Sequence, residues 1–547
     1  MPQRLAEWCR RELPSLLLAG AASAAFTAFF TWPQALHFGT SVAEHQDSLF
    51  SMWRLSWIAH ALATAPRHVF DGNVFHPEVR TLAFSDATLL EGILGTPFLW
   101  MGVPPVMVYN LLFLGGIAAS GVAMFVLVRY LTASSGAAVV STAVFTMAPY
   151  RIEHFGHLEL QWAMWAPLVF WALHRAVDHA SWRSGLLAGV FLWLQVLSCV
   201  YYGVFLALAT SALAVALSII APGRVARALP GLVGGAVLGA LLTVPYALPY
   251  LHNARTLGQR DMAEVAMYSA RPASYLMSPA QNWLWGWTSQ WGAPELQLFP
   301  GLAAVGLALV GLLSRPRLLA WVYGALTLLF VELSLGVNGH VYPWLLAWVP
   351  FLKGLRSPSR FAIMVCAVLA VGAGFGARAL ERRFQRPGRV IAIAGVLILM
   401  AAEYANRGMA LMDPESARRA TAYQMIEASG PGVVVELPLP VAESLPGRDP
   451  HYQFWSRLHW HPLINGYSGY YPVGYIRTLE QMRRFPDDES VARLKRLNVR
   501  YVVVHREFME PDEYSELLLR LHAREELRFL GTFSDPIGEA SLFMLVP

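Results

Sequence analysis

The chain has 547 residues, of which 56% are hydrophobic and only 14% are charged. Soluble domains carry charge on about a quarter of their residues, so this composition excludes an ordinary soluble enzyme and a disordered chain. The formal net charge of +5 is almost all arginine, and no block of five or more like charges occurs, which argues against a nucleic-acid partner. The 43 glycines, 35 prolines and 19 tryptophans favour a membrane protein.

Long apolar runs recur along the chain, and about eleven of them are candidates to cross a hydrocarbon core of about 30 Å as helices. A further short run, 344–351, is expected to form a half-helix. In chain order the candidate spans are residues 13–30, 106–128, 131–147, 160–173, 185–200, 202–220, 229–248, 298–313, 318–335, 361–380 and 390–404.

Arginine placement supports this count, because short cytoplasmic loops carry an excess of Lys and Arg. With the N-terminus in the cytoplasm, every predicted inner loop is short and contains arginine, from Arg129 to the arginine-rich stretch 378–389. The predicted outer segments are longer. An odd number of spans places the tail outside the membrane.

The sequence predicts two domains with a boundary near residue 405. Residues 1–405 form a transmembrane domain with a first outer loop at 33–105, and residues 406–547 form a small α/β domain on the periplasmic or extracellular side. In this tail, strand-like runs alternate with helical patterns, at 432–437, 490–497, 499–505 and 511–523. A structural cap and a substrate-binding domain both fit such a tail.

The first outer loop contains two acidic residues beside apolar stretches, Asp47 and Asp86. A carboxylate next to an apolar surface at the membrane interface destabilises the fold unless it is paired, so such a residue is a candidate for a function. One interpretation is a general base that acts on an acceptor hydroxyl, with a second carboxylate that holds a metal or the acceptor. The structural interpretation is that Asp47 caps a helix that begins at Ser48, runs to Ala65 and lies along the membrane surface.

The second outer loop places His154 and His157 three residues apart, with Glu153 beside the first of them. Imidazole and carboxylate groups at this spacing could present ligands to a divalent cation. Paired histidines at a membrane surface are also often only interfacial, so the sequence leaves both interpretations open.

A third group of candidate residues precedes the run at 361–380, where Lys353, Arg356 and Arg360 lie beside two serines. Three cations at the start of a helix suit a phosphate group, although a loop that faces lipid headgroups has the same composition. Three arginines of the preceding outer segment are weaker candidates to join them, Arg255, Arg260 and Arg271.

The tail stretch 455–472 is dense in aromatic side chains and hydrogen-bonding groups, including Asn465 and Tyr467. Sugar rings stack on aromatic side chains that have polar groups beside them. The same aromatic side chains could instead only pack in the core of the domain. No phosphate-binding Gly-rich loop, Rossmann fingerprint or nucleophile-elbow motif occurs in the sequence.

Several of these stretches, taken together, resemble the GT-C superfamily of integral-membrane glycosyltransferases, and within it a bacterial type that depends on polyprenyl-phosphate sugars. Together these stretches cover the chain from end to end and are fairly specific for the superfamily. Each stretch alone is a weak signal. The matching stretches are residues 47–54, 81–86, 148–151 with 156–158, 356–361 and 465–470.

The resemblance implies an enzyme that moves a sugar from a polyprenyl-phosphate carrier to an acceptor glycan, lipid or protein at the outer face of the bacterial inner membrane, with inversion. It implies that Asp47 is the general base, with Asp86 as a second catalytic acid. The implied donor-phosphate contacts are Lys353, Arg356 and Arg360, and the implied acceptor or sugar contacts are His157, Asn465 and Tyr467. The implied ligands of a Mg²⁺ or Mn²⁺ ion are Asp86, Glu153, His154 and His157.

The acid pair typical of the family is replaced here by Gln46–Asp47, so a metal-independent enzyme also fits the sequence. Two other functions remain open. A transporter or flippase for a lipid-linked saccharide needs ionisable groups at mid-membrane depth, and Glu332 is nearly the only such residue. A non-catalytic scaffold for envelope assembly would use the tail to bind partners.

Overall fold

The computed structural model describes residues 2–258, 260–314, 318–414 and 420–546. The chain forms two compact units. The first unit comprises Met1–His37, Asn110–Leu248 and Gly258–Ala410, and the second comprises Phe38–Tyr109, Pro249–Leu257 and Leu411–Pro547.

The predicted boundary near residue 405 lies close to the end of the first unit at Ala410. The sequence predicts that the first outer loop belongs to the transmembrane domain, whereas the structure places residues 38–109 in the same unit as the tail. Hydropathy identifies segments that enter a membrane, but it does not show which polar segments pack on one another.

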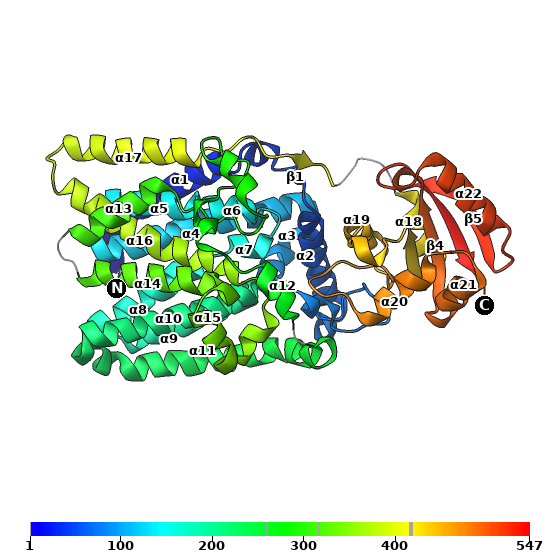
Figure 1. Ribbon diagram of the computed structural model, residues 1–547, viewed down its shortest axis with the longest axis horizontal. Helices are drawn as coiled ribbons and strands as arrows, with labels where there is room; N and C mark the ends of the chain where they lie inside the picture. Colours follow the sequence, from blue (N-terminus) through cyan, green and yellow to red (C-terminus); the bar gives the residue numbers. More distant parts are fainter. Residues whose placement is uncertain (1, 259, 315–317, 415–419, 547) are drawn as a thin grey trace. The chain divides into compact units, whose positions relative to one another are not determined.

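The first unit is built from apolar helices that run side by side (Figure 1). Each of the eleven predicted apolar runs overlaps a helix, although the run at 160–173 begins in the short helix α7 (Leu158–Gln161) and continues into α8 after a break. These helices are α1 (Pro2–Phe30), α4 (Pro105–Thr132), α5 (Ser135–Thr146), α8 (Trp165–His179), α9 (Trp182–Ser198), α10 (Val200–Ile220), α11 (Pro222–Leu257), α13 (Leu302–Leu313), α14 (Leu318–Ser334), α16 (Ala362–Glu381) and α17 (Gly388–Tyr404). The predicted half-helix is α15 (Val341–Trp348).

Five helical segments of the described residues are long and apolar enough to cross a membrane, and the number of spans beyond these five stays a prediction. Helix α11 also exposes apolar side chains at helical spacing, a surface that suits contact with lipid rather than water. The exposed residues are Leu229, Val233, Val237, Leu241, Val244 and Leu248. Composition and helix length together support a multi-pass membrane protein.

Helix α16 lies in the core of the first unit and is almost completely buried. It packs closely on α13, because a Cβ atom at Gly376 would lie only 1.9 Å from the carbonyl oxygen of Leu307. Small residues allow helix backbones to approach in this way. The close packing fixes the position of α16, and with it the arginine-containing segment that leads into its first turn.

The second unit contains a four-stranded sheet in the order β3–β4–β6–β5. Strands β3 (Val433–Leu437) and β4 (Val499–His505) are parallel, whereas β6 (Glu539–Leu545) is antiparallel to both β4 and β5 (Leu527–Ser534). The sequence predicts β3 and β4 correctly, but it does not predict β5 and β6. Strand β5 is an edge strand with several exposed residues, so it lacks the continuous apolar run that marks the buried strands.

Helices in the tail include α18 (Thr421–Ala428), α20 (Val473–Met482), α21 (Asp488–Arg496) and α22 (Pro511–His522). The predicted helices at 490–497 and 511–523 are confirmed as α21 and α22. The sequence did not predict α18 and α20.

The first outer segment folds together with the tail. Its helix α2 (Gln46–Thr64) packs against α19 (Asp449–Trp455) of the tail, and strand β1 (Val42–Ala43) pairs with β2 (Leu411–Met412). The backbone N–H of Phe75 also donates to the carbonyl of Asn465 at 3.1 Å. Two segments that are distant in sequence therefore share one core.

The buried strands of the sheet contain a charged network. The ring of His505 donates from Nδ1 to Asp535 at 2.6 Å and from Nε2 to Glu436 at 2.7 Å, and all three residues are fully buried. The hydroxyl of Tyr423 donates to Glu436 as well, at 2.8 Å. Despite its burial, the two acidic neighbours raise the pKa of His505 to about 9, so the imidazole is positively charged at neutral pH, donates through both ring nitrogens and offsets the negative charge of its partners.

Raising the pH should destabilise the second unit through this network. Burial alone would lower the pKa of His505, but the hydrogen bonds and negative charges of Asp535 and Glu436 raise it to about 9. A raised pKa stabilises the fold fully below the unfolded value of about 6.5, and this stabilisation is lost as the pH rises through about 9. At about 1.4 kcal/mol for each pKa unit, the loss is about 3 kcal/mol.

The unfolding temperature of the full chain in detergent, measured between pH 6 and pH 10, checks this prediction. A His505→Gln variant should unfold at a lower temperature and show a flatter pH dependence. His522→Gln, at an exposed histidine of the same unit, is the matched control. Equal pH dependence of the wild type and His505→Gln would contradict the assignment of the charge to His505.

Candidate functional site

Asp47 lies in the first turn of α2, which begins at Gln46. The cap of this helix is His45, whose Nδ1 accepts from the backbone N–H of Asp47 at 3.2 Å. The expectation that Asp47 caps a helix beginning at Ser48 is therefore wrong. Its carboxylate lies instead near the N-terminal end of the helix dipole, which stabilises a negative charge.

The carboxylate of Asp47 is held by the tail. Its Oδ1 accepts from the hydroxyl of Tyr467 at 2.8 Å, and its Oδ2 lies 3.3 Å from Nδ1 of His45. The Tyr467 ring packs edge-on against Phe50 with 5.3 Å between centroids, and its backbone N–H donates to Gln453 at 2.6 Å. The side chain of Asp47 keeps 12% of its surface exposed, so the carboxylate is fixed and still reachable by solvent.

A hydrogen bond from Arg54 connects the backbone of Asp86 to helix α2. The guanidinium of Arg54 is buried, donates to the backbone carbonyl of Asp86 and to Ser51, and lies over the ring of Phe50 at 4.3 Å. A Cβ atom at Gly469 would lie 3.1 Å from the carbonyl oxygen of Phe84. Segments 47–54, 81–86 and 465–470, three of the stretches that carry the resemblance, therefore come together in the second unit.

Asn465 has a structural role rather than the expected contact with a sugar. It is fully buried, and its side-chain amide exchanges two hydrogen bonds with the backbone of Glu436, at 2.8 and 3.0 Å. It also donates to Asp449 at 3.0 Å. With both ends of the amide engaged inside the core, Asn465 fixes the segment that carries Tyr467 to strand β3.

In the first unit, Arg360 lies in the short 3₁₀ helix η8 (Pro358–Phe361), directly before α16. One of its nitrogens, Nη2, lies 2.8 Å from Oε1 of Glu295 and 3.3 Å from Nε2 of His157. Because a guanidinium only donates, His157 accepts through this nitrogen. The hydroxyl of Tyr150 donates to the Arg360 carbonyl at 3.4 Å. Segments 148–158 and 356–361, the two remaining stretches of the resemblance, therefore meet here.

Arg356 and Arg260 lie on either side of one carboxylate. Arg356 is 3.5 Å from Oε1 of Glu264 and Arg260 is 3.4 Å from Oε2. The ring of Tyr201 connects this pair to Arg360, since the Arg356 backbone N–H donates to its hydroxyl at 3.0 Å and Arg360 lies over its face at 5.2 Å. Arg260, a weaker candidate from the sequence, thus joins two of the predicted phosphate contacts.

The third predicted phosphate contact, Lys353, has an exposed side chain. Its backbone carbonyl accepts from the Arg260 N–H at 3.4 Å. Glu264 and Glu295 orient the three guanidinium groups through ion pairs.

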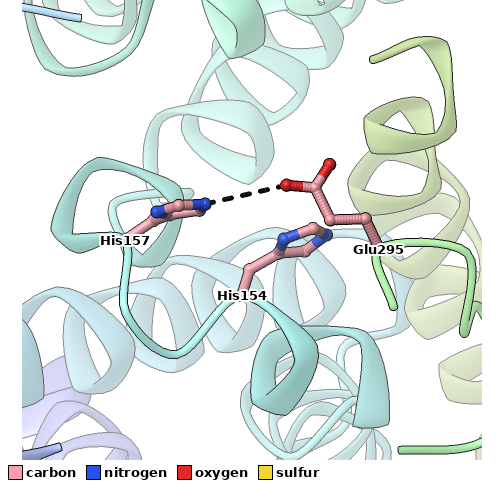
Figure 2. Close-up of side chains that lie close together, drawn as sticks. All are labelled: His154, His157 and Glu295. Atoms are coloured by element: carbon pink, nitrogen blue, oxygen red, sulfur yellow. Dashed lines mark ion pairs between the residues drawn. The ribbon is translucent and has the colours of Figure 1, made fainter. Parts of the chain in front are cut away.

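His154, His157 and Glu295 converge in the first unit (Figure 2). One ligand atom from each lies within 4.8 Å of the others, and this is the group of possible metal ligands found among the described residues. Two of the four predicted metal ligands, His154 and His157, therefore lie in one group. Glu153 accepts the backbone N–H of Glu295 at 2.7 Å, and it is Glu295 that supplies the carboxylate to the group. Asp86 belongs to the second unit.

The ionisation of these groups follows from their surroundings. Burial alone would raise the pKa of Glu295, but the positive charge of Arg360, 2.8 Å away, holds it well below its ordinary value. Burial, together with the charge of Arg360, lowers the pKa of His154 well below its ordinary value. Glu295 is therefore an anion and His154 a neutral imidazole, the forms that bind a cation.

Sequence reasoning missed Glu295, Glu264 and Tyr201. Glu264 follows Arg260 by four residues, a spacing that signals an ion pair on a helix. Tyr201 lies at the start of an apolar run, and Glu295 follows a tryptophan-rich stretch without any spacing that links it to a histidine. Only the fold reveals their place in the site.

No protein-family model matches the chain, and no curated protein matches it. Among solved structures, the chain is similar to the arabinofuranosyltransferase AftD from Mycobacteria, determined by single-particle cryo-EM, with a TM-score of 0.62. The match covers 97% of this chain and 40% of that protein, with 14% sequence identity. At this identity the likeness shows the fold alone.

Proposed function

We propose that this protein is a membrane glycosyltransferase that moves a sugar from a polyprenyl-phosphate carrier to an acceptor at the outer face of the bacterial inner membrane. The observation that carries the proposal is the carboxylate of Asp47, which the hydroxyl of Tyr467 holds in place while part of the side chain stays exposed. The likeness of the fold to a glycosyltransferase supports the reaction class.

In the proposed reaction, Asp47 removes the proton of an acceptor hydroxyl as the oxygen attacks the anomeric carbon of the donor sugar. The bond between that carbon and the phosphate oxygen breaks at the same time. The polyprenyl phosphate leaves with the bonding electron pair, and the new glycosidic bond has the inverted configuration. The proton resides on Asp47 until water removes it.

The leaving phosphate needs positive charge where its oxygens gain negative charge. Arg260, Arg356 and Arg360 supply three guanidinium groups, which pair bidentately with phosphate oxygens. Arg360 is the most buried of the three, with 6% of its side chain exposed, so its charge acts in a medium where electrostatic interactions are strong. We propose donor-phosphate binding for these arginines of the first unit and acceptor activation for Asp47 of the second unit as two separate assignments, each tested by its own variant.

One observation argues against the transporter alternative. Glu332, the ionisable residue that this alternative would use, accepts the backbone N–H groups of His340 and Val341, the latter at 2.9 Å. It therefore caps α15 from the end of α14, a structural role at a helix terminus. The metal requirement that the resemblance leaves open is a separate question.

The test of the proposal is sugar transfer by the purified full-length protein in liposomes of bacterial lipid. We expect consumption of a polyprenyl-phosphate sugar and release of polyprenyl phosphate, measured by mass spectrometry. Because the similar structure is an arabinofuranosyltransferase, polyprenyl-phosphate arabinofuranose is the first donor to test. Movement of intact lipid-linked sugar between leaflets, without cleavage, would contradict the proposal and support a transporter.

A further inference from the structure

The donor set of His154, His157 and Glu295 suits a different cation from the Mg²⁺ or Mn²⁺ that the resemblance implies. Two imidazole nitrogens and one carboxylate oxygen are ligands that Zn²⁺ takes in proteins, whereas Mg²⁺ prefers oxygen ligands alone. We propose that these three side chains form a Zn²⁺ site, and that the guanidinium of Arg360 occupies the position of the ion in the described conformation. The inference is independent of the proposed sugar transfer.

The distances in the group are close to those of a zinc centre. Nε2 of His157 and Oε1 of Glu295 are 3.9 Å apart, and all three ligand atoms lie within 4.8 Å of one another. Around a tetrahedral Zn²⁺ with bonds of about 2.0–2.2 Å, neighbouring ligand atoms are about 3.3–3.6 Å apart. Side-chain rotations that bring the atoms together by roughly 1 Å would complete the geometry.

His154 supplies an independent indication of a ligand. Its side chain is 1% exposed, and neither ring nitrogen has a hydrogen-bond partner among the described residues. A buried polar group left without a partner costs about 1–3 kcal/mol. A metal ion bound by one ring nitrogen would give that nitrogen a partner and remove its share of this cost.

The surrounding structure already orients the ligands. The backbone N–H of His157 donates to the carbonyl of His154 at 3.1 Å, so one tight turn carries both imidazoles. Ser357 donates to Oε2 of Glu295 at 3.2 Å, and Glu153 holds the Glu295 backbone at 2.7 Å. Partners of this kind orient metal ligands in proteins and raise metal affinity.

Arg360 competes with a metal ion for the same atoms. Its Nη2 lies 2.8 Å from Oε1 of Glu295 and 3.3 Å from Nε2 of His157, which are two of the atoms that the ion would use. A guanidinium and a dication cannot share them, because like charges at this distance repel strongly. Zn²⁺ therefore binds only when Arg360 turns away, and a neutral residue at position 360 should strengthen zinc binding.

The test measures zinc binding directly, by competition with a fluorescent zinc chelator. The full-length protein carries a purification tag without histidine and is freed of metal before ZnCl₂ is added in detergent. We expect one ion per chain, at least tenfold weaker binding by His154→Ala, and about tenfold tighter binding by Arg360→Gln. His179→Ala, at an exposed histidine of the same unit, is the matched control and should bind like the wild type.

Equal zinc affinity of the wild type and His154→Ala would overturn the proposal, as would the absence of zinc binding by both the wild type and Arg360→Gln. If His154→Ala is not monodisperse in size-exclusion chromatography, the same comparison with His157→Ala decides. No sugar donor is present in this experiment, so its result and the result of the transfer assay are obtained separately.

Discussion

Replacing Asp47 with asparagine should abolish sugar transfer and leave the fold unchanged. Asparagine has the same size, and its amide oxygen can still accept from Tyr467, whose hydroxyl lies 2.8 Å from the present carboxylate. The amide cannot take a proton from the acceptor, so the contribution of general base catalysis, about 10²–10⁴-fold in rate, is lost. Product formation by the purified variant in liposomes measures this effect.

Asp71→Asn is the matched control for this substitution. Asp71 belongs to the same unit and pairs with His68 at 2.8 Å, with about a third of its side chain exposed. This variant should keep wild-type transfer. Full transfer by Asp47→Asn would exclude Asp47 as the base, and restoration of a deletion strain by an inactive Asp47→Asn protein would favour the scaffold function.

Replacing Arg360 with glutamine should weaken binding of polyprenyl phosphate about 10- to 100-fold. A hydrogen bond to a charged group contributes about 1.5–3 kcal/mol, and about 1.4 kcal/mol corresponds to a tenfold change in affinity. Titration of the detergent-purified full chain with polyprenyl phosphate measures the change. Arg407→Gln, at an exposed arginine of the same unit that lies over Trp283, is the matched control and should bind normally.

The Arg360→Gln substitution also removes the ion-pair partner of Glu295. Removing one member of a buried ion pair leaves the other charge uncompensated and destabilises the fold. The double variant Arg360→Gln with Glu295→Gln relieves this charge, so it should recover thermal stability without recovering phosphate affinity. Unchanged affinity in both variants would contradict the assignment of the phosphate to Arg360.

Composition and periodicity predict the helical body well, because a membrane span requires a long apolar segment and the chain contains few other apolar segments of that length. The tail is predicted only in part. Strands β3 and β4 are continuous apolar runs, but β5 places exposed residues such as Arg528 and Thr532 in an edge strand, where the apolar signal is weak.

The candidate site is predicted in its arginines and histidines but not in its carboxylates. Arg356, Arg360 and His157 occur in short clusters of chemically similar residues, which local sequence reveals. Glu295 is about 140 residues from His154, and only tertiary structure brings them together. The resemblance implies a sugar contact for Asn465, but its side chain is fully buried in the core, and the sequence does not show this burial.

The shared core of the first outer segment and the tail has a consequence for biosynthesis. Asp47 and the tyrosine that holds it are 420 residues apart in the chain. At synthesis rates of about 5–20 residues per second, Tyr467 is synthesised roughly 20–80 s after Asp47. A chain terminated before Tyr467 would leave the carboxylate without this hydrogen bond, so we expect the proposed activity only after Tyr467 has been synthesised.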